Sequence, residues 1–306
     1  MVSATRPGPL DGAVREAFAV SWGKARDLVR TGKITVNGAV VTDTLHRVAL
    51  GAGLSLNMAA PRRSRSVLAE DAVVFLDAQV IVVRKPSGIS TIPFGDDEQE
   101  HTLDEQIRTY LTRRTKDKSG VAALGVVHRL DKETSGLIVF TRTWLAKKSL
   151  TAQFRAHTVH RRYMAIAHGD VRKATYRTHL LENRGDGLRG SFEQSRFARG
   201  KRPEEAKYAV THIEPVEKLN GATLVRCILE TGRTHQIRIH LSEAGNPIVG
   251  ERVYSRHFTG PEIPAPRLML HAAELGFVHP ATNLDVRFEE PLPKDFEETL
   301  ARLRRS

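Results

Sequence analysis

The sequence contains very little cysteine. Cys227 is the only one among the 306 residues, which excludes an intrachain disulfide and leaves no cysteine pair to hold a zinc ion. Long apolar runs are missing as well: no stretch approaches the ~20 residues of a membrane span, and the N-terminal segment lacks the apolar core of a secretory signal. We therefore expect a protein of the reducing cytoplasm without a membrane anchor.

Signatures of bound cofactors are also absent. There is no glycine-rich phosphate loop of the P-loop or dinucleotide type. The histidines lack the helical i, i+4 pairing with a nearby carboxylate that zinc hydrolases show. The sequence therefore predicts neither a nucleotide cofactor nor a metal site.

Basic side chains are in clear excess. The 47 Lys and Arg residues outnumber 35 Asp and Glu, which gives a formal net charge of +12 and a pI of about 10.1. Such an excess fits a polyanionic partner, but charge alone does not separate RNA, DNA and an anionic membrane. Hydrophobic residues make up 40% of the chain, which is enough for a folded core. The length favours one large domain with a smaller appendage.

Residues 1–60 have the pattern of a small helical domain with a hairpin. Leu10, Val14 and Phe18 recur at helical spacing, and Ser21 can cap a second helix that Gly32 ends. The dipeptide at residues 37–38, Asn-Gly, lies between two β-branched runs and predicts a type I′ turn. The polar, basic segment 61–70 is predicted to be a linker.

Residues 71–306 are predicted to form the larger domain, in which strands and helices mix without a regular βαβ repeat. This pattern favours an α+β fold with a largely antiparallel sheet. Strands are predicted at 73–77, 80–86, 124–130, 137–143, 161–169, 222–230, 268–279 and 284–290. Helices are predicted at 103–111, at 144–157 with Thr143 as N-cap, at 234–245, and after Pro293. Residues 184–205 are predicted to be an irregular loop or a loose hairpin.

Segment 128–137, His-Arg-Leu-Asp-Lys-Glu-Thr-Ser-Gly-Leu, carries the strongest chemical signal. It places the carboxylate of Asp131 on a tight loop between two predicted strands, where a sheet would hold it rigidly. Ser135 and Gly136 would shape the turn. The alternative is that Asp131 only caps this turn and pairs with Lys132 or Arg129.

This segment resembles the catalytic loop of the RluA-type pseudouridine synthases, which has the form HRLDxxTSGL. Further resemblances to the same family occur in the same order between about Asp71 and Arg302, at residues 84–88, 162–165, 231–240, 270–272 and 279–280. The resemblance implies the pseudouridine synthase fold, a largely antiparallel mixed sheet flanked by helices. It also implies isomerisation of uridine in a structured RNA by base flipping, without a cofactor.

The resemblance implies roles for individual residues. Asp131 would be the essential carboxylate, Tyr163 would lie against the target uracil, and Arg238 would pair with Asp131 and keep it ionised. Alternatively, Tyr163 is an ordinary strand aromatic and Arg238 a solvated surface charge. The residues expected to contact the substrate are Lys85, His128, Arg129, Arg233, His235 and Gln236.

Residues 1–60 resemble the S4-type RNA-binding domain, in positions between Ser21 and Val48. The residues expected to contact RNA are Lys24, Arg26, Arg30 and Lys33. Arg26 and Arg30 are i, i+4 neighbours that can form one basic helix face. Two departures from the family patterns stand out: Trp22, where a basic residue is common, and Gly250-Glu251, where the synthases usually have Gly-Asp.

Three function classes are compatible with these residues. An active synthase is favoured, because Asp131, Tyr163 and Arg238 are all present. The alternatives are a catalytically idle RNA-binding or ribosome-assembly protein, and a nucleobase hydrolase with Glu133 as its second carboxylate. We expect a monomer that acts on ribosomal RNA, with transfer RNA as the alternative substrate.

Overall fold

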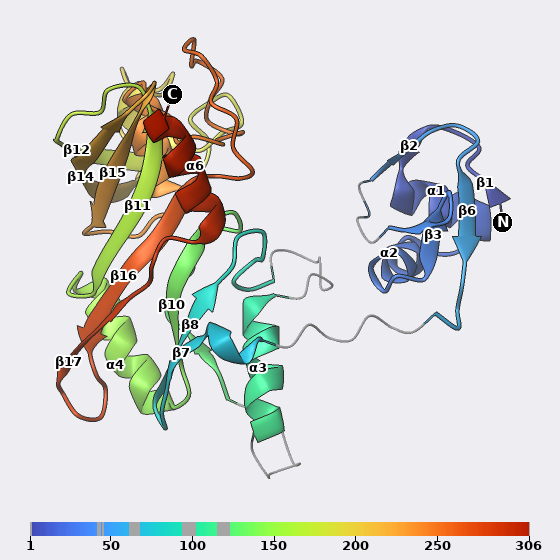
Figure 1. Ribbon diagram of the computed structural model, residues 1–306, viewed down its shortest axis with the longest axis horizontal. Helices are drawn as coiled ribbons and strands as arrows, with labels where there is room; N and C mark the ends of the chain where they lie inside the picture. Colours follow the sequence, from blue (N-terminus) through green and yellow to red (C-terminus); the bar gives the residue numbers. More distant parts are fainter. Residues whose placement is uncertain are drawn as a thin grey trace. The chain divides into compact units, whose positions relative to one another are not determined.

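The computed structural model describes residues 2–41, 44, 46–60, 68–93, 102–114 and 123–305, without the side chain of Arg30. The chain divides into two compact units (Figure 1): Met1–Val67 with Ile92–Gln106, and Leu68–Thr91 with Ile107–Ser306. The predicted linker, residues 61–70, lies largely outside the described residues. The domain boundaries drawn from the sequence therefore stay a prediction.

The first unit begins with the two predicted helices, α1 (Leu10–Phe18) and α2 (Trp22–Arg30). The hydroxyl of Ser21 accepts a hydrogen bond from the backbone N–H of Lys24 at 3.3 Å, so the predicted N-cap of α2 is confirmed. Strands β3 (Ile34–Val36) and β4 (Ala39–Val40) form the predicted hairpin. Asn37 and Gly38 have φ values of 49° and 85°, as a type I′ turn requires.

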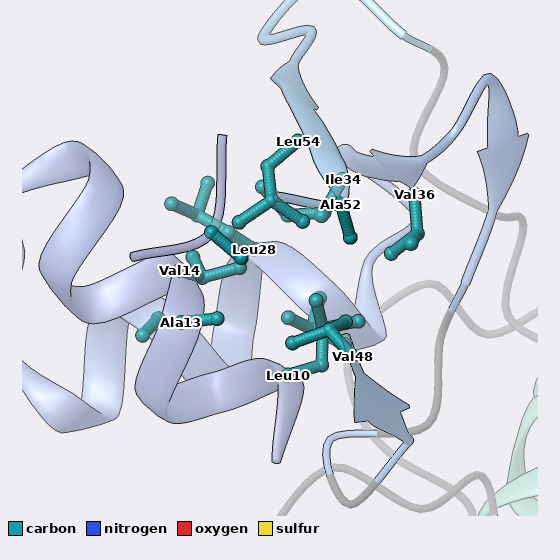
Figure 2. Close-up of a cluster of buried hydrophobic side chains, with 12 residues drawn as sticks. Leu10, Ala13, Val14, Leu28, Ile34, Val36, Val48, Ala52 and Leu54 are labelled. Carbon is teal, nitrogen blue, oxygen red and sulfur yellow. The ribbon is translucent and has the colours of Figure 1, made fainter. Parts of the chain in front are cut away.

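An apolar core holds this first unit together. Its four-stranded sheet has the order β1 (Val2–Ser3), β6 (Gly53–Leu56), β3, β4, and a separate pair joins β2 (Gly8–Pro9) to β5 (Arg47–Val48). Figure 2 shows Leu10 and Val14 of α1 and Leu28 of α2 gathered with Ile34 and Leu54 from the sheet. Burial of each such side chain contributes about 1.5–3 kcal/mol, which ties both helices to the sheet.

The second unit is built on an eleven-stranded mixed sheet (Figure 1). Its order is β13 (Gly190–Ser191), β12 (Ala174–Leu181), β14 (Lys207–Leu219), β15 (Ala222–Leu229), β11 (His160–His168), β16 (Leu270–Val278), β10 (Ser135–Thr141), β8 (Val80–Lys85) and β7 (Val73–Leu76). Strand β17 (Asp285–Glu289) also pairs with β16, and β9 (Gly125–Val126) with β10. Among the described strands only β10 and β16 pair in parallel, which confirms a largely antiparallel mixed sheet in an α+β fold.

Helices and short 3₁₀ turns accompany this sheet, and all except α3, which the division between the units cuts after Gln106, belong to the second unit. They are η1 (Glu70–Ala72), α3 (Leu103–Arg114), α4 (Trp144–Arg155), η2 (Phe192–Gln194), α5 (Gln236–Glu243) and α6 (Lys294–Arg305). The predicted cap of α4 is confirmed, because the Thr143 hydroxyl accepts from the N–H of Ala146 at 3.1 Å. Leu150 of α4 belongs to a buried apolar cluster that also contains residues of β8, β10 and β16. Within the described part of the chain, no helix is both long enough and apolar enough to cross a membrane.

The structure corrects three local expectations. The strand expected at 124–130 is reduced to β9, because the residues after Val126 leave the sheet to form the loop that carries Asp131. The helix expected from Thr234 begins at Gln236, with His235 at its N-cap in the left-handed conformation and without a capping hydrogen bond. Strands β12 and β14 were not predicted, since their polar sequences show no strong apolar run.

The parallel neighbours β10 and β16 approach each other closely where β10 begins. Gly136 has a φ of 115°, and a Cβ there would overlap the backbone of Ala272, with the nitrogen only 2.6 Å away. Beside it, the hydroxyl of Ser135 is bonded to Nδ1 of His271 at 2.9 Å. Glycine at 136 therefore lets the end of the Asp131 loop lie against β16.

Substitution of Gly136 by alanine should strongly destabilise the second unit. A left-handed alanine costs about 1–2 kcal/mol, and the overlap with Ala272 adds a further ~1–3 kcal/mol. Gly187 is the matched control, because its φ of 84° is also positive but nothing lies within 4 Å of an added Cβ. Chemical denaturation measures both variants. Equal losses of unfolding free energy for Gly136→Ala and Gly187→Ala would contradict the steric argument.

Candidate active site

The backbone of the loop that carries Asp131 is fixed by the segment that follows β8. This loop, residues 127–134, closes on itself through the N–H of Thr134, which donates to the carbonyl of Asp131 at 3.1 Å. Four groups of segment 85–91 donate to loop carbonyls: Lys85 Nζ and Gly88 N to Lys132, Ser87 Oγ to Glu133, and Thr91 Oγ1 to Leu130, at 2.6–2.9 Å. The Asp131 carboxylate is thus held on a rigid support.

Lys85 supports this loop from below. Its side chain is fully buried, and Nζ donates to the carbonyls of Pro86 at 3.0 Å and of Lys132 at 2.9 Å. Burial lowers the pKa of Lys85 to about 7, against the opposing charges of Asp131 and Glu133. The predicted substrate contact is therefore corrected: Lys85 is enclosed beneath the loop and its donors are used by the protein.

Tyr163 lies at an irregularity of β11. The register of β11 against β16 shifts between Arg162 and Tyr163, and a bulge of this kind re-aims the side chain next to it. The side chain is buried, and burial raises the pKa of Tyr163 to about 12. Asp131 adds to this rise, so its negative charge acts directly on the phenol. The structure thus brings Tyr163 and Asp131 into one site.

Arg238 on α5 forms a buried bidentate ion pair with Glu251. Its Nε and Nη2 each lie 2.7 Å from a carboxylate oxygen, and only 4% and 0% of the two side chains is exposed. Arg238 is therefore not the solvated surface charge of the alternative interpretation, but its ion-pair partner is Glu251 and not the expected Asp131. Asp131 acts on it at longer range and, with Glu251, raises the pKa of Arg238 against its desolvation.

The same guanidinium reaches the Asp131 loop on its other side. Nη1 of Arg238 lies 3.8 Å from a carboxylate oxygen of Glu133. From the loop, Nη2 of Arg129 donates to the hydroxyl of Thr234 at 2.5 Å. Residues 129 and 133 therefore face residues 234 and 238, and Asp131 lies between these two contacts. The segment 231–240 closes the site opposite the loop.

Three further predicted substrate contacts differ from one another in exposure and bonding. Arg129 is exposed. Arg233 is partly exposed, and its Nε donates to the carbonyl of Tyr208. Gln236 is buried and bonded at both ends of its amide, to Thr231, Arg233, Val210 and Thr211, so it braces the segment and does not reach a substrate.

His128, another predicted substrate contact, is bonded within the second unit. Its Nε2 accepts from the backbone N–H of Val139 at 3.1 Å, and its ring stacks on Phe154 of α4 at 4.6 Å. Burial lowers the pKa of His128 to about 3, which keeps the imidazole neutral and able to accept. The residue fastens the Asp131 loop to the sheet.

His235 and Tyr254 form a hydrogen-bonded pair beside Arg238. Nδ1 of His235 lies 2.7 Å from the Tyr254 hydroxyl, and the guanidinium of Arg238 lies over the tyrosine ring, 5.3 Å from its centroid. The backbone N–H of Tyr254 donates to Glu251 at 3.3 Å. Sequence reasoning missed Tyr254 and noted Glu251 only as a departure, since neither lies at a spacing that relates it to Asp131.

The basic residues expected to bind RNA in the first unit are only partly available. Lys33 is buried, and its Nζ donates to the carbonyls of Met58 and Ala60, which corrects its predicted role. Nε of Arg26 donates to Asp11 at 3.0 Å, and Nζ of Lys24 lies 3.6 Å from Asp27. The side chain of Arg30 is outside the described residues. Lys24, which is exposed, stays predicted as a phosphate contact.

Metal ligands are not clustered in the part of the chain that the structure describes. No group of three or more His, Cys, Asp or Glu side chains there could hold an ion.

The fold is shared with solved structures of RNA pseudouridylate synthase domain proteins. The structure is similar to human RNA Pseudouridylate Synthase Domain Containing 4, with a TM-score of 0.61, 23% identity, and coverage of 76% of this chain and 93% of that chain. Human RNA Pseudouridylate Synthase Domain Containing 1 gives a TM-score of 0.56 at the same identity, covering 74% of this chain and 86% of that one. At this identity the likeness shows the fold.

Sequence comparison gives the family. Residues 79–243 match the model described as RNA pseudouridylate synthase. The chain is 32% identical over 289 residues to Ribosomal large subunit pseudouridine synthase D of Zymomonas mobilis, covering 90% of this chain and 86% of the relative. The protein of the same name from Pseudomonas aeruginosa is 33% identical over 294 residues, covering 90% and 85%. The chain therefore belongs to the RNA pseudouridylate synthase family, and it is an isomerase that acts on RNA.

Lys85 should give the protein a measurable pH dependence of stability. Its pKa is about 7 when folded and about 10.4 in an unfolded chain, so between these values the unfolded state binds more protons and stability rises with pH. Between pH 7 and pH 10 the free energy of unfolding of the wild type should rise by at least about 1.4 kcal/mol more than that of Lys85→Met. This difference corresponds to one pKa unit. Denaturation at each pH measures this gain, with the exposed Lys148→Met as control. Parallel curves for wild type and Lys85→Met would contradict it.

Substitution of Lys33 should lower stability, whereas substitution of Lys24 should change the salt dependence of RNA affinity. Lys33→Met removes the donor of the Met58 and Ala60 carbonyls, which lie in residues that are at least partly exposed, so water can replace part of the lost interaction. The substitution should cost about 0.5–1.5 kcal/mol of stability, with an unchanged salt dependence of RNA affinity. Lys24→Met should leave stability unchanged and reduce the slope of log affinity against log salt by about 0.7–0.9, the value for one lost phosphate contact. Thermal melting and salt titration of full-length variants test both. A flatter salt slope in Lys33→Met would restore its predicted RNA contact.

Proposed function

We propose that this protein converts specific uridines of ribosomal RNA to pseudouridine, with Asp131 as the catalytic carboxylate. One observation carries the proposal: the rigid loop of Asp131 contacts Thr234 and Arg238 through Arg129 and Glu133, while the Asp131 carboxylate has no ion-pair partner among the described residues. A carboxylate that only stabilised the fold would be paired with one of these neighbours. Asp131 is instead left available to a substrate.

The site accounts for the steps of the isomerisation. A uridine within a folded RNA must leave its stack to enter the site, and the ring of Tyr163 offers a surface for the flipped uracil. Asp131 assists cleavage of the N1–C1′ bond, the uracil turns, and C5 bonds to C1′. The C5 proton is then lost and N1 gains one, so the product is an isomer of the substrate. The carboxylate can act on the sugar carbon or on a sugar proton.

The protein surroundings suit this use of Asp131. The Arg238 guanidinium contacts the loop that carries Asp131 and brings positive charge to this side of the site. Because Nε and Nη2 of Arg238 both donate to Glu251, the guanidinium is held in place without binding Asp131 directly. Tyr163 remains protonated at neutral pH, since its pKa is raised to about 12. Neither neighbour competes with a substrate for the Asp131 oxygens.

Ribosomal RNA is proposed as the substrate on two grounds. The two relatives named above are ribosomal large subunit pseudouridine synthases and match nine-tenths of this chain. The net charge of +12 supports binding to a large polyanion. The S4-type character of residues 1–60 would add a second RNA contact, and an enzyme of this kind would work in the cytoplasm.

Asp131→Asn should abolish isomerisation while RNA affinity stays within a few-fold of wild type. The carboxylate supplies chemistry and makes little contribution to phosphate binding, so turnover should fall by more than about a hundredfold. Release of tritium from RNA labelled at uridine C5 measures turnover. Glu133→Gln is the matched control, because Glu133 lies on the same loop with its side chain 48% exposed, and it should retain most activity.

Each outcome of this assay separates the function classes. Full activity in Asp131→Asn would exclude Asp131 as the catalytic carboxylate. RNA binding without tritium release by the wild type would indicate an idle RNA-binding protein, and base loss that depends on Glu133 would indicate a hydrolase. Ribosomal and transfer RNA are tested separately, and release from transfer RNA alone would replace the proposed substrate.

A further inference from the structure

His235, the N-cap residue of α5, has an unusual backbone conformation and makes no capping hydrogen bond. Its φ of 57° and ψ of 19° are left-handed, a conformation that few non-glycine residues adopt, histidine being among the more frequent of them, and its side chain does not cap α5. The side chain is partly exposed, between the Asp131 loop and Tyr254. Backbone conformations of this kind persist at functional sites because neighbouring contacts enforce them.

The bond to Tyr254 assigns the tautomer of His235. Burial raises the pKa of Tyr254 to about 12, so its hydroxyl keeps its proton. Within the described part of the chain, Nδ1 of His235 is the hydroxyl's only recorded partner. If the imidazole donated from Nδ1, the phenolic proton would have no acceptor, whereas donation from Tyr254 to Nδ1 satisfies both groups. The imidazole proton is then on Nε2.

Nε2 is the end of the imidazole that the protein leaves available. No hydrogen bond to Nε2 is recorded among the described residues, although Nδ1 is bonded. The charged groups that act on His235 are Asp131, Arg238, Glu251 and Arg189, and Asp131 has the largest influence of the four. Burial lowers the pKa of His235 despite the charge of Asp131, so the ring is predominantly neutral at pH 7. A neutral ring with Nδ1 occupied can only donate from Nε2.

Tyr254 itself is fixed by the buried ion pair. Its N–H and that of Val253 donate to the same oxygen of Glu251, at 3.3 and 2.8 Å. Arg238 covers its ring, and the ring packs with Ile239 of α5. The phenol therefore has one position from which to donate, and that position sets the orientation of His235.

We propose that Tyr254 is a positioning residue that holds His235 with its Nε2–H directed at the target nucleotide, where it donates a hydrogen bond to an oxygen atom of that nucleotide. This inference rests on the proposed function, because it requires a uridine next to Asp131. It assigns a substrate contact to one nitrogen of His235 and a role to Tyr254. A donor fixed in advance can favour the turned uracil or the sugar over the stacked substrate.

Two amide substitutions separate this proposal from a structural role. In His235→Gln the amide nitrogen reaches the position of Nε2 and keeps the donor, while the bond to Tyr254 is lost. In His235→Asn the shorter amide reaches only the position of Nδ1, which keeps the bond to Tyr254 and suits the left-handed backbone. The proposal expects His235→Gln to keep turnover within about threefold, and His235→Asn to lose about tenfold or more, like His235→Ala.

A structural role for His235 gives the opposite order. His235→Asn would then be the active variant, and His235→Gln would lose both activity and melting temperature. Turnover is measured as tritium release from ribosomal RNA with the full chain, with kcat and KM determined separately and melting temperature recorded for each variant. Equal activity of the two variants would also overturn the proposal.

Tyr254→Phe adds an independent readout. The phenyl ring keeps its packing and its contact with Arg238, so the melting temperature should change little. Without the hydroxyl, the imidazole proton is no longer kept on Nε2, and kcat should fall by about three- to tenfold. In His235→Gln the hydroxyl no longer sets the donor, so adding Tyr254→Phe should have no further effect on kcat. Additive losses would show that Tyr254 does not act through His235. Wild-type turnover and its loss in Asp131→Asn decide the proposed function separately.

Discussion

The buried ion pair between Arg238 and Glu251 is the interaction on which the site depends. A lone guanidinium with 4% exposure would be very costly, and the bidentate carboxylate with its two backbone donors makes it tolerable. With that pair in place, positive charge is available next to Asp131 without a direct bond that would occupy the carboxylate. The glutamate at position 251 is thus more than a departure from the usual Gly-Asp: it reaches the guanidinium that α5 provides.

The ion pair also fixes residues beyond α5. Glu251 fixes Tyr254 through its backbone N–H, Arg238 covers the tyrosine ring, and the tyrosine hydroxyl bonds to His235. On the opposite side of the site, segment 85–91 satisfies the carbonyls of the Asp131 loop, and Gly136 permits the close contact with β16. Two sets of contacts from distant parts of the sequence therefore hold the residues around Asp131.

Histidines in this protein illustrate how burial and a single hydrogen bond decide a role. His128 and His235 both belong to segments that resemble the catalytic motifs, and burial lowers the pKa of each. Nε2 of His128 accepts from the backbone N–H of Val139, and its ring stacks on Phe154, so the residue ties the Asp131 loop to β10. Nδ1 of His235 is bonded instead to a side-chain hydroxyl, that of Tyr254, beside Arg238. Residue type and motif membership are the same, but the available chemistry differs.

The sequence alone determined the features that depend on near neighbours. Helical spacing around Leu10, the cap at Ser21, the turn at Asn37-Gly38 and the loop of Asp131 all follow from short-range chemistry, and the structure has each of them. Partners distant in sequence were decided only by the tertiary structure: Glu251 for Arg238, Tyr254 for His235, and the carbonyls of Met58 and Ala60 for Lys33. The physical reason is that a charged or polar group takes whichever complementary group the fold buries beside it, and no spacing along the chain encodes that choice.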